Sequence, residues 1–127
     1  MLNSVHVITL FFEDVAGAKT FYERVFDAPV VYEDEDSLVL GFSGVMVNLL
    51  KLGSAPELVE PNAVAPAKDG VSVLLTIEVQ DVDGVCQVLR EHGVSLLNGP
   101  IDRPWGRRTA AFADPSGHVW EVAQVLD

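Results

Sequence analysis

The 127-residue chain has little of several features that often reveal function. Its single cysteine, Cys86, excludes an internal disulfide bond and is typical of a protein from a reducing compartment. No apolar run is long enough to span a bilayer, and no positively charged N-terminal region precedes a hydrophobic segment. The sequence therefore predicts a cytoplasmic protein without a membrane partner.

Positive charge is also scarce. The chain has 8 lysines and arginines against 19 aspartates and glutamates, which gives a formal net charge of −11 at pH 7. Phosphate binding needs a basic surface, so this balance argues against a nucleic-acid partner. It favours a cationic small molecule or a basic partner, but an acidic surface that only keeps the protein soluble explains it more simply. Glycine-rich phosphate loops and a Gly-x-Ser-x-Gly turn are absent.

The most specific local pattern is a predicted β-hairpin near the C-terminal end. Thr109–Ala113 and Val119–Gln124 are strand-like, and Asp-Pro-Ser-Gly lies between them. Proline presets φ at the second turn position and glycine tolerates a positive φ at the exit, so this connection is a tight turn. The hairpin carries one carboxylate, Glu121, in the middle of its second strand.

The rest of the chain predicts the same order of elements twice. Asp14 and Asp81 are each placed to cap a helix after a strand, and Gly93 is placed to end the second helix. Three of the seven prolines lie between Gly53 and Gly70, which is typical of a linker. The remaining strands are predicted at 5–12, 29–33, 37–41, 45–51, 71–79 and 94–97.

The two halves align with an offset of 67 residues, from Asp14 to Asp81. We therefore predict an α+β fold of two tandem βαβββ modules that form a curved mixed sheet around a cavity. Module one is expected at about 1–52, a linker at about 53–70 and module two at about 71–127, all within one domain.

With these features the sequence resembles the vicinal oxygen chelate superfamily, which includes glyoxalases, bleomycin resistance proteins and extradiol dioxygenases. The resemblance is carried by three segments, and it extends over nearly the whole chain. It implies the fold firmly and the function weakly, because this fold supports several chemistries. The segments are Glu13–Phe26, Asp81–Gly84 and Ala113–Glu121.

The resemblance implies four metal-ligand positions, one on the first and one on the last strand of each module. In this sequence they fall on Val7, Asn48, Leu74 and Glu121, of which only Glu121 is a usual ligand. We therefore predict no metal and no cofactor. His6 lies one residue out of register, so it should be a half-buried structural residue on the helix side unless a bulge turns it.

Within the superfamily, the run Pro104-Trp105-Gly106-Arg107 is similar to the bleomycin-resistance members. The resemblance implies a metal-free, acidic homodimer that binds a planar, cationic drug. Trp105 would stack on such a ligand or would anchor the loop by packing on its own strand; both alternatives remain open. Trp120 and Cys86 are predicted to be core residues. The predicted ligand-binding residues are Val7, Thr9, Phe11, Met46, Asn48, Leu74, Thr76, Glu78, Trp105 and Glu121.

The sequence thus predicts a binding protein that sequesters a hydrophobic or cationic small molecule without a metal, as antibiotic-resistance proteins of this kind do. The alternative is a metal-dependent glyoxalase-like lyase or isomerase, or a dioxygenase, that uses Glu121 with a metal recruited through His6 or through water. Separately, Glu78 and Glu121 could both face the cavity, where two carboxylates could serve as acid and base or could simply attract a cation. A third alternative is a regulatory module without a small ligand.

Overall fold

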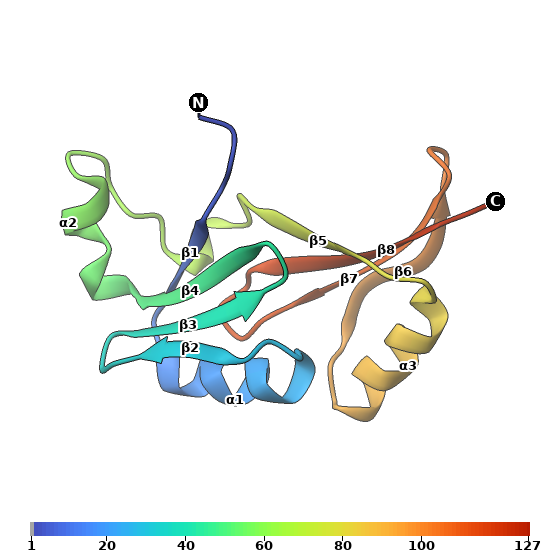
Figure 1. Ribbon diagram of the computed structural model, residues 1–127, viewed down its shortest axis with the longest axis horizontal. Helices are drawn as coiled ribbons and strands as arrows, with labels where there is room; N and C mark the ends of the chain where they lie inside the picture. The colour runs from blue at the N-terminus through green and yellow to red at the C-terminus, as the bar shows by residue number, and fades with distance from the viewer. Residues whose placement is uncertain (1) are drawn as a thin grey trace. The chain divides into compact units, whose positions relative to one another are not determined.

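The computed structural model describes residues 2–127, which divide into two compact units after Pro66. We call the units module 1 and module 2. Each consists of a strand, a helix and three further strands, so the two tandem βαβββ modules and the α+β class are confirmed (Figure 1). Module 1 contains β1 (Val7–Phe12), α1 (Val15–Val25), β2 (Val30–Glu33), β3 (Ser37–Phe42) and β4 (Val45–Lys51). Module 2 contains β5 (Leu74–Glu78), α3 (Val82–Glu91), β6 (Leu96–Arg103), β7 (Arg107–Ala113) and β8 (Val119–Val125).

Each module has one four-stranded mixed sheet with the same order of strands. The order is β1-β4-β3-β2 in module 1 and β5-β8-β7-β6 in module 2. The first strand pairs in parallel with the last strand of its module, and the other pairs are antiparallel. Helix α1 contacts β3 and β4, and α3 contacts β6, β7 and β8, so the helix of each module packs on one face of its sheet.

Alternation along the strands builds the two cores between sheet and helix. In β1, Leu10 and Phe12 are buried on the helix side, and Phe12 meets Tyr22 of α1 with ring centroids 6.1 Å apart. In module 2, the predicted core residues Cys86 and Trp120 are buried, as expected. Burial raises the pKa of the Cys86 thiol, which keeps it protonated and unreactive.

Both helices begin as the sequence predicts. The Asp14 carboxylate accepts a hydrogen bond from the Gly17 N–H at 3.0 Å, and the Asp81 carboxylate accepts one from the Gly84 N–H at 3.1 Å. Aspartate caps a helix because its side chain satisfies a backbone donor that has no partner within the helix. The start of α3 has a second acceptor, since Gln124 Oε1 accepts from the Val82 N–H at 2.9 Å.

The proline-rich segment that follows β4 contains short helices where the sequence predicts a linker. They are a 3-10 turn at Leu52–Ser54, helix α2 at Pro56–Val59 and a 3-10 turn at Ala67–Asp69. Pro56 begins α2, a position at which proline's fixed φ and missing N–H are tolerated. The longest helix of the described residues, α1, has 11 residues, and none is long and apolar enough to cross a bilayer.

The largest departure from the predicted elements is in β6. The sequence predicts that this strand ends at Leu97, because Gly99-Pro100 looks like a break, but it continues to Arg103. β6 is an edge strand with register shifts on both sides of Asn98, and an edge tolerates proline. Gly99 has a φ of +87°, and a Cβ there would collide with the carbonyl of Thr109.

Candidate functional site on the open sheet faces

The face of each sheet opposite its helix, which we call the open face, carries the predicted ligand-binding residues of the strands. In module 1, Val7 pairs with Met46 and Thr9 pairs with Asn48 across the parallel β1–β4 ladder. Alternation along β1 places Phe11 on this open face too. Strand and register thus bring all five residues together as one surface that is apolar apart from Thr9 and Asn48.

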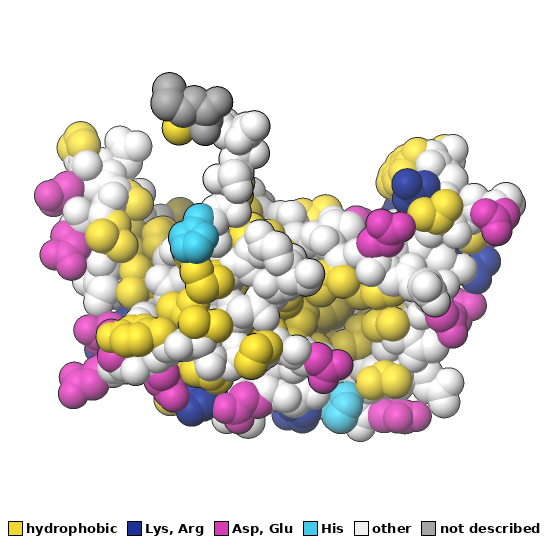
Figure 2. All heavy atoms as spheres, in the orientation of Figure 1, with side chains coloured by type: hydrophobic (Ala, Val, Ile, Leu, Met, Phe, Trp, Pro, Cys, Tyr) yellow, Lys and Arg dark blue, Asp and Glu magenta, His cyan; other side chains and the backbone are white. Residues whose placement is uncertain are grey.

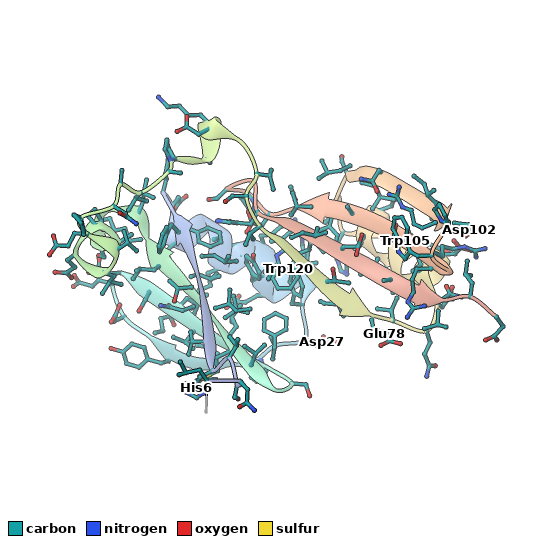
Figure 3. All side chains as sticks on the ribbon, turned by 90° about the horizontal axis from the view of Figure 1, so that it is seen from above. His6, Asp27, Glu78, Asp102, Trp105 and Trp120 are labelled. Carbon is teal, nitrogen blue, oxygen red and sulfur yellow. The ribbon has the colours of Figure 1, made fainter. Side chains whose placement is uncertain are left out.

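In module 2, the open face places Glu121 beside Thr76. The two residues are partners in the β5–β8 ladder, and the Thr76 hydroxyl donates to Glu121 Oε1 at 3.0 Å. Leu74 and Glu78 lie on the same face of β5, two residues to either side of Thr76. Glu121 is half-buried, whereas Glu78 is exposed at the end of β5 (Figure 3).

The two modules use equivalent positions differently. Thr9 and Asn48 of module 1 occupy the ladder positions that Thr76 and Glu121 occupy in module 2. Asn48 Oδ1 is a buried side-chain acceptor that has no hydrogen-bond partner among residues 2–127. A buried acceptor without a donor is costly unless another molecule supplies one, so Asn48 is a potential contact for a ligand.

Trp105 lies at the tip of the hairpin formed by β6 and β7. Its side chain is 66% exposed, so the structure favours an accessible ring over a packed anchor. In Figure 3, Trp105 lies over the end of the module 2 sheet where β6 and β7 join. The Arg103 guanidinium carbon is 5.9 Å from the centroid of the indole ring. Because this is within the range of a cation–π contact, the arginine holds the ring from one side.

Arg103 is a residue that the sequence reasoning missed. Its Nε donates to Thr109 Oγ1 at 2.9 Å and its Nη2 donates to Asn98 Oδ1 at 3.3 Å, across the open face of β6 and β7. Because the sequence predicts that this strand ends at Leu97, it places neither Asn98 nor Arg103 on a strand and does not indicate that they lie close together. The alternation of Arg107 and Thr109 along β7 was the available signal.

His6 and His118 lie outside the open faces, as expected for histidines that are not metal ligands. His6 precedes β1 and is exposed, which corrects the prediction that it is half-buried. A residue before the first ladder pair is not covered by α1. His118 is held in the turn after β7, where its Nδ1 lies 2.9 Å from Oδ2 of the buried Asp114. The same carboxylate accepts from the Ser116 and His118 N–H groups, which fixes the turn.

The side chains at the four superfamily metal positions do not fit a divalent ion. Module 1 contributes Val7 and Asn48, and module 2 contributes Leu74 and Glu121. The two hydrocarbon side chains offer no donor atom, and the orphan oxygen of Asn48 is a weak ligand compared with histidine or a carboxylate. Among residues 2–127, no three histidine, cysteine, aspartate or glutamate residues are grouped so that they could hold a metal.

Comparison with known proteins agrees with the fold. The model of the glyoxalase/bleomycin resistance protein/dioxygenase superfamily matches residues 4–122. The chain belongs to this superfamily. A member from Nocardioides superposes with a TM-score of 0.88 at 22% identity, covering 100% of this chain and 86% of that one. A family enzyme from Burkholderia phytofirmans superposes with a TM-score of 0.80 at 19% identity, covering 98% and 100% of the two chains.

Relatives by sequence differ in what is known of them. The uncharacterized protein YraH of Bacillus subtilis is 30% identical over 123 residues, which cover 94% of this chain and 96% of YraH. The metallothiol transferase FosB of Staphylococcus saprophyticus is 21% identical over 122 residues, which cover 96% of this chain and 77% of FosB. Membership of the superfamily leaves the reaction or ligand open, since its members include enzymes and resistance proteins.

Proposed function

We propose that this superfamily member binds a small organic molecule without a metal ion and acts by sequestering it. The observation that carries the proposal is the set of side chains at the metal positions, in which Val7 and Leu74 offer no donor atom. A metal-dependent activity of the kind that the name of FosB implies would have to be built on Glu121 alone.

Glu121 is the residue that we expect to orient the ligand. Thr76 donates to one of its oxygens, and the carboxylate is half-buried on an open face that also carries Leu74. An ionised carboxylate there accepts hydrogen bonds from a positively charged or donor group, while neighbouring apolar atoms cover the rest of the ligand. The net charge of −11 favours the approach of a cation.

The remaining parts of the proposal follow from the superfamily. We propose that the protein is cytoplasmic and forms a homodimer, and that Val7, Thr9, Phe11, Met46 and Asn48 on the open face of module 1 contact small ligands, with Asn48 as a hydrogen-bonding group. The compound would be hydrophobic or cationic, as for the resistance proteins of the superfamily, and the exposed ring of Trp105 offers a flat surface for it.

The test is a calorimetric titration of the full chain with 2-naphthylmethylammonium in the presence of a metal chelator. We expect binding that Glu121→Gln weakens about tenfold, because a charge-assisted hydrogen bond is lost. Glu13→Gln is the matched control: it makes the same change in charge at an exposed site between β1 and α1, outside the predicted ligand-binding residues, and should change the affinity much less. Binding that requires an added metal ion, or that is equally weakened by both variants, would contradict the proposal.

A further inference from the structure

The tip of the β6–β7 hairpin brings two arginines to the same face of the module 2 sheet. Arg103 and Arg107 are direct partners in the antiparallel β6–β7 ladder, so their side chains leave the sheet on the same side. Two like charges at directly opposite positions repel each other and destabilise the pair. A protein with 19 acidic residues could readily place a carboxylate between them.

No carboxylate of the described chain does so. Neither Arg103 nor Arg107 forms an ion pair among residues 2–127. The neighbouring Arg108 points to the other face and is neutralised by Asp102 at 2.7 Å and by Asp83 at 3.1 Å. The contrast shows that the arginine with a structural role has acidic partners, whereas the two on the open face keep their charge uncompensated.

Arg103 is nevertheless held in place. Its acceptors, Thr109 Oγ1 and Asn98 Oδ1, are neutral, and its guanidinium lies near the ring of Trp105. A guanidinium has five N–H donors, so three remain for a ligand after these two hydrogen bonds. Arg107 donates from Nη1 only to the carbonyl of Gly106, at 3.3 Å. Both arginines are therefore held by neutral groups, which do not neutralise their positive charges.

The two arginines also share the open face with Glu121. Thr109, which holds Arg103, pairs with Ala123, and Glu121 is two residues before Ala123 on β8. Residues two apart on a strand lie on the same face. In Figure 2, basic and hydrophobic side chains lie side by side at the tip of this hairpin, at the upper right, and acidic side chains flank them in this view.

We infer that Arg103 and Arg107 form an oxyanion-binding site on module 2, which takes a carboxylate or phosphate group of the bound small molecule beside the exposed ring of Trp105. Guanidinium groups bind such oxygens through paired, charge-assisted hydrogen bonds, and an anion between the arginines would remove their mutual repulsion. The inference rests on the proposed function and narrows it. The ligand would be zwitterionic, with its positive group at Glu121 and its oxyanion at the hairpin.

The test uses NMR titration of the full chain with two probes at constant ionic strength, 2-naphthoate and the neutral 2-naphthamide. We expect 2-naphthoate to shift the side-chain N–H signals of Arg103, Arg107 and Trp105 and to bind more tightly than the amide. Arg107→Gln should weaken 2-naphthoate about threefold to fivefold, as expected for one accessible ion pair. This variant should fold normally, because the side chain forms no ion pair among residues 2–127 and its hydrogen bond is to the neighbouring Gly106 carbonyl.

Arg24→Gln is the matched control, since it removes one positive charge from the exposed last turn of α1 in module 1. Equal binding of amide and carboxylate, or equal weakening by Arg24→Gln and Arg107→Gln, would overturn the inference. Inorganic phosphate as a third probe shows whether the oxyanion alone is sufficient. If 2-naphthylmethylammonium binds through Glu121 but 2-naphthoate does not bind, the inference fails and the proposed function stands. If only 2-naphthoate binds, through the arginines, the oxyanion site stands and the cation-binding function fails.

Discussion

In module 1 the turn between the second and third strands is acidic, whereas in module 2 the corresponding hairpin tip is basic. The first turn, between β2 and β3, follows Glu33 and contains Asp34, Glu35 and Asp36, and Lys19 of α1 lies 2.8 Å from Glu33. The tip of the second hairpin is Arg103-Pro-Trp-Gly-Arg107, and within residues 2–127 neither arginine has an acidic partner. Equivalent turns of the two modules therefore carry opposite charges. The repeated fold fixes the position of each turn but does not fix the type of its side chains.

The cores differ in the same way. Around α1, Tyr22 and Phe26 stack with ring centroids 5.1 Å apart, and Phe21, Phe12 and Phe42 complete a group of aromatic rings. Around α3, the buried residues of the helix are Val82, Cys86 and Leu89. Helix α1 therefore packs through aromatic rings and α3 through smaller side chains, although Phe112 and Trp120 are buried in module 2 as well.

The largest effect expected from this comparison is in the core. Tyr22 and Leu89 occupy equivalent positions of α1 and α3, and both are buried. Tyr22→Ala should lower the free energy of unfolding by about 3–5 kcal/mol, because a whole ring and its contacts are lost. Leu89→Ala should cost about 2–3 kcal/mol, since fewer atoms leave the core. Urea unfolding followed by circular dichroism measures both; a smaller loss for Tyr22→Ala than for Leu89→Ala would break the comparison.

A gain in stability is expected on the open face of module 1. Asn48→Leu removes a buried oxygen that has no partner in the described chain, and should raise the free energy of unfolding by about 1–2 kcal/mol. Glu121→Leu at the equivalent position should give no such gain, because its carboxylate already accepts from Thr76. Thermal unfolding of the two variants provides the measurement. Destabilisation by Asn48→Leu would show that the amide has a partner that this account lacks.

The helix caps should differ by less. Asp14→Ala should destabilise the protein by about 1 kcal/mol, as is usual for the loss of an N-cap side chain. Asp81→Ala should cost less, because Gln124 still accepts from the Val82 N–H and keeps the start of α3 attached to β8, although the Gly84 N–H loses its acceptor. Adding Gln124→Ala to Asp81→Ala should restore the full cost. Urea midpoints that are equal for Asp14→Ala and Asp81→Ala would argue that Gln124 contributes nothing.

The smallest effect is a pH dependence that both modules share. A hydrogen bond from Arg108 and its charge lower the pKa of Asp102, and the Asp36 N–H, followed by Tyr32, does the same for Asp34. A pKa lowered by folding stabilises the protein above the unfolded value of about 4, and this stability is lost as the pH falls below it. The difference in melting temperature between the wild type and Asp102→Asn should therefore be constant from pH 5 to 8 and shrink towards pH 2. A difference that grows on acidification would contradict this assignment.

Local signals in the sequence predicted most of the fold. The capping aspartates, the alternation in β1 and the Asp-Pro-Ser-Gly turn each depend on residues that are close in sequence, and all three are observed. The arginine site depends on a register between β6 and β7 that contains bulges, and Gly99-Pro100 hides the strand that carries it. His6 is exposed because α1 does not extend over the start of β1. The extent of that packing is a tertiary feature that no local sequence pattern shows.

We propose above all that the four superfamily metal positions, Val7, Asn48, Leu74 and Glu121, hold no metal ion, and that Glu121 binds an organic group instead. Elemental analysis of the full chain after incubation with nickel, zinc, iron and manganese, each followed by removal of unbound ion, tests it most directly. We predict no stoichiometric uptake of any of the four ions, in the wild type and in Glu121→Gln alike. Uptake of one ion per chain that Glu121→Gln abolishes would contradict metal-free binding and place the protein with the metal-dependent enzymes of its superfamily.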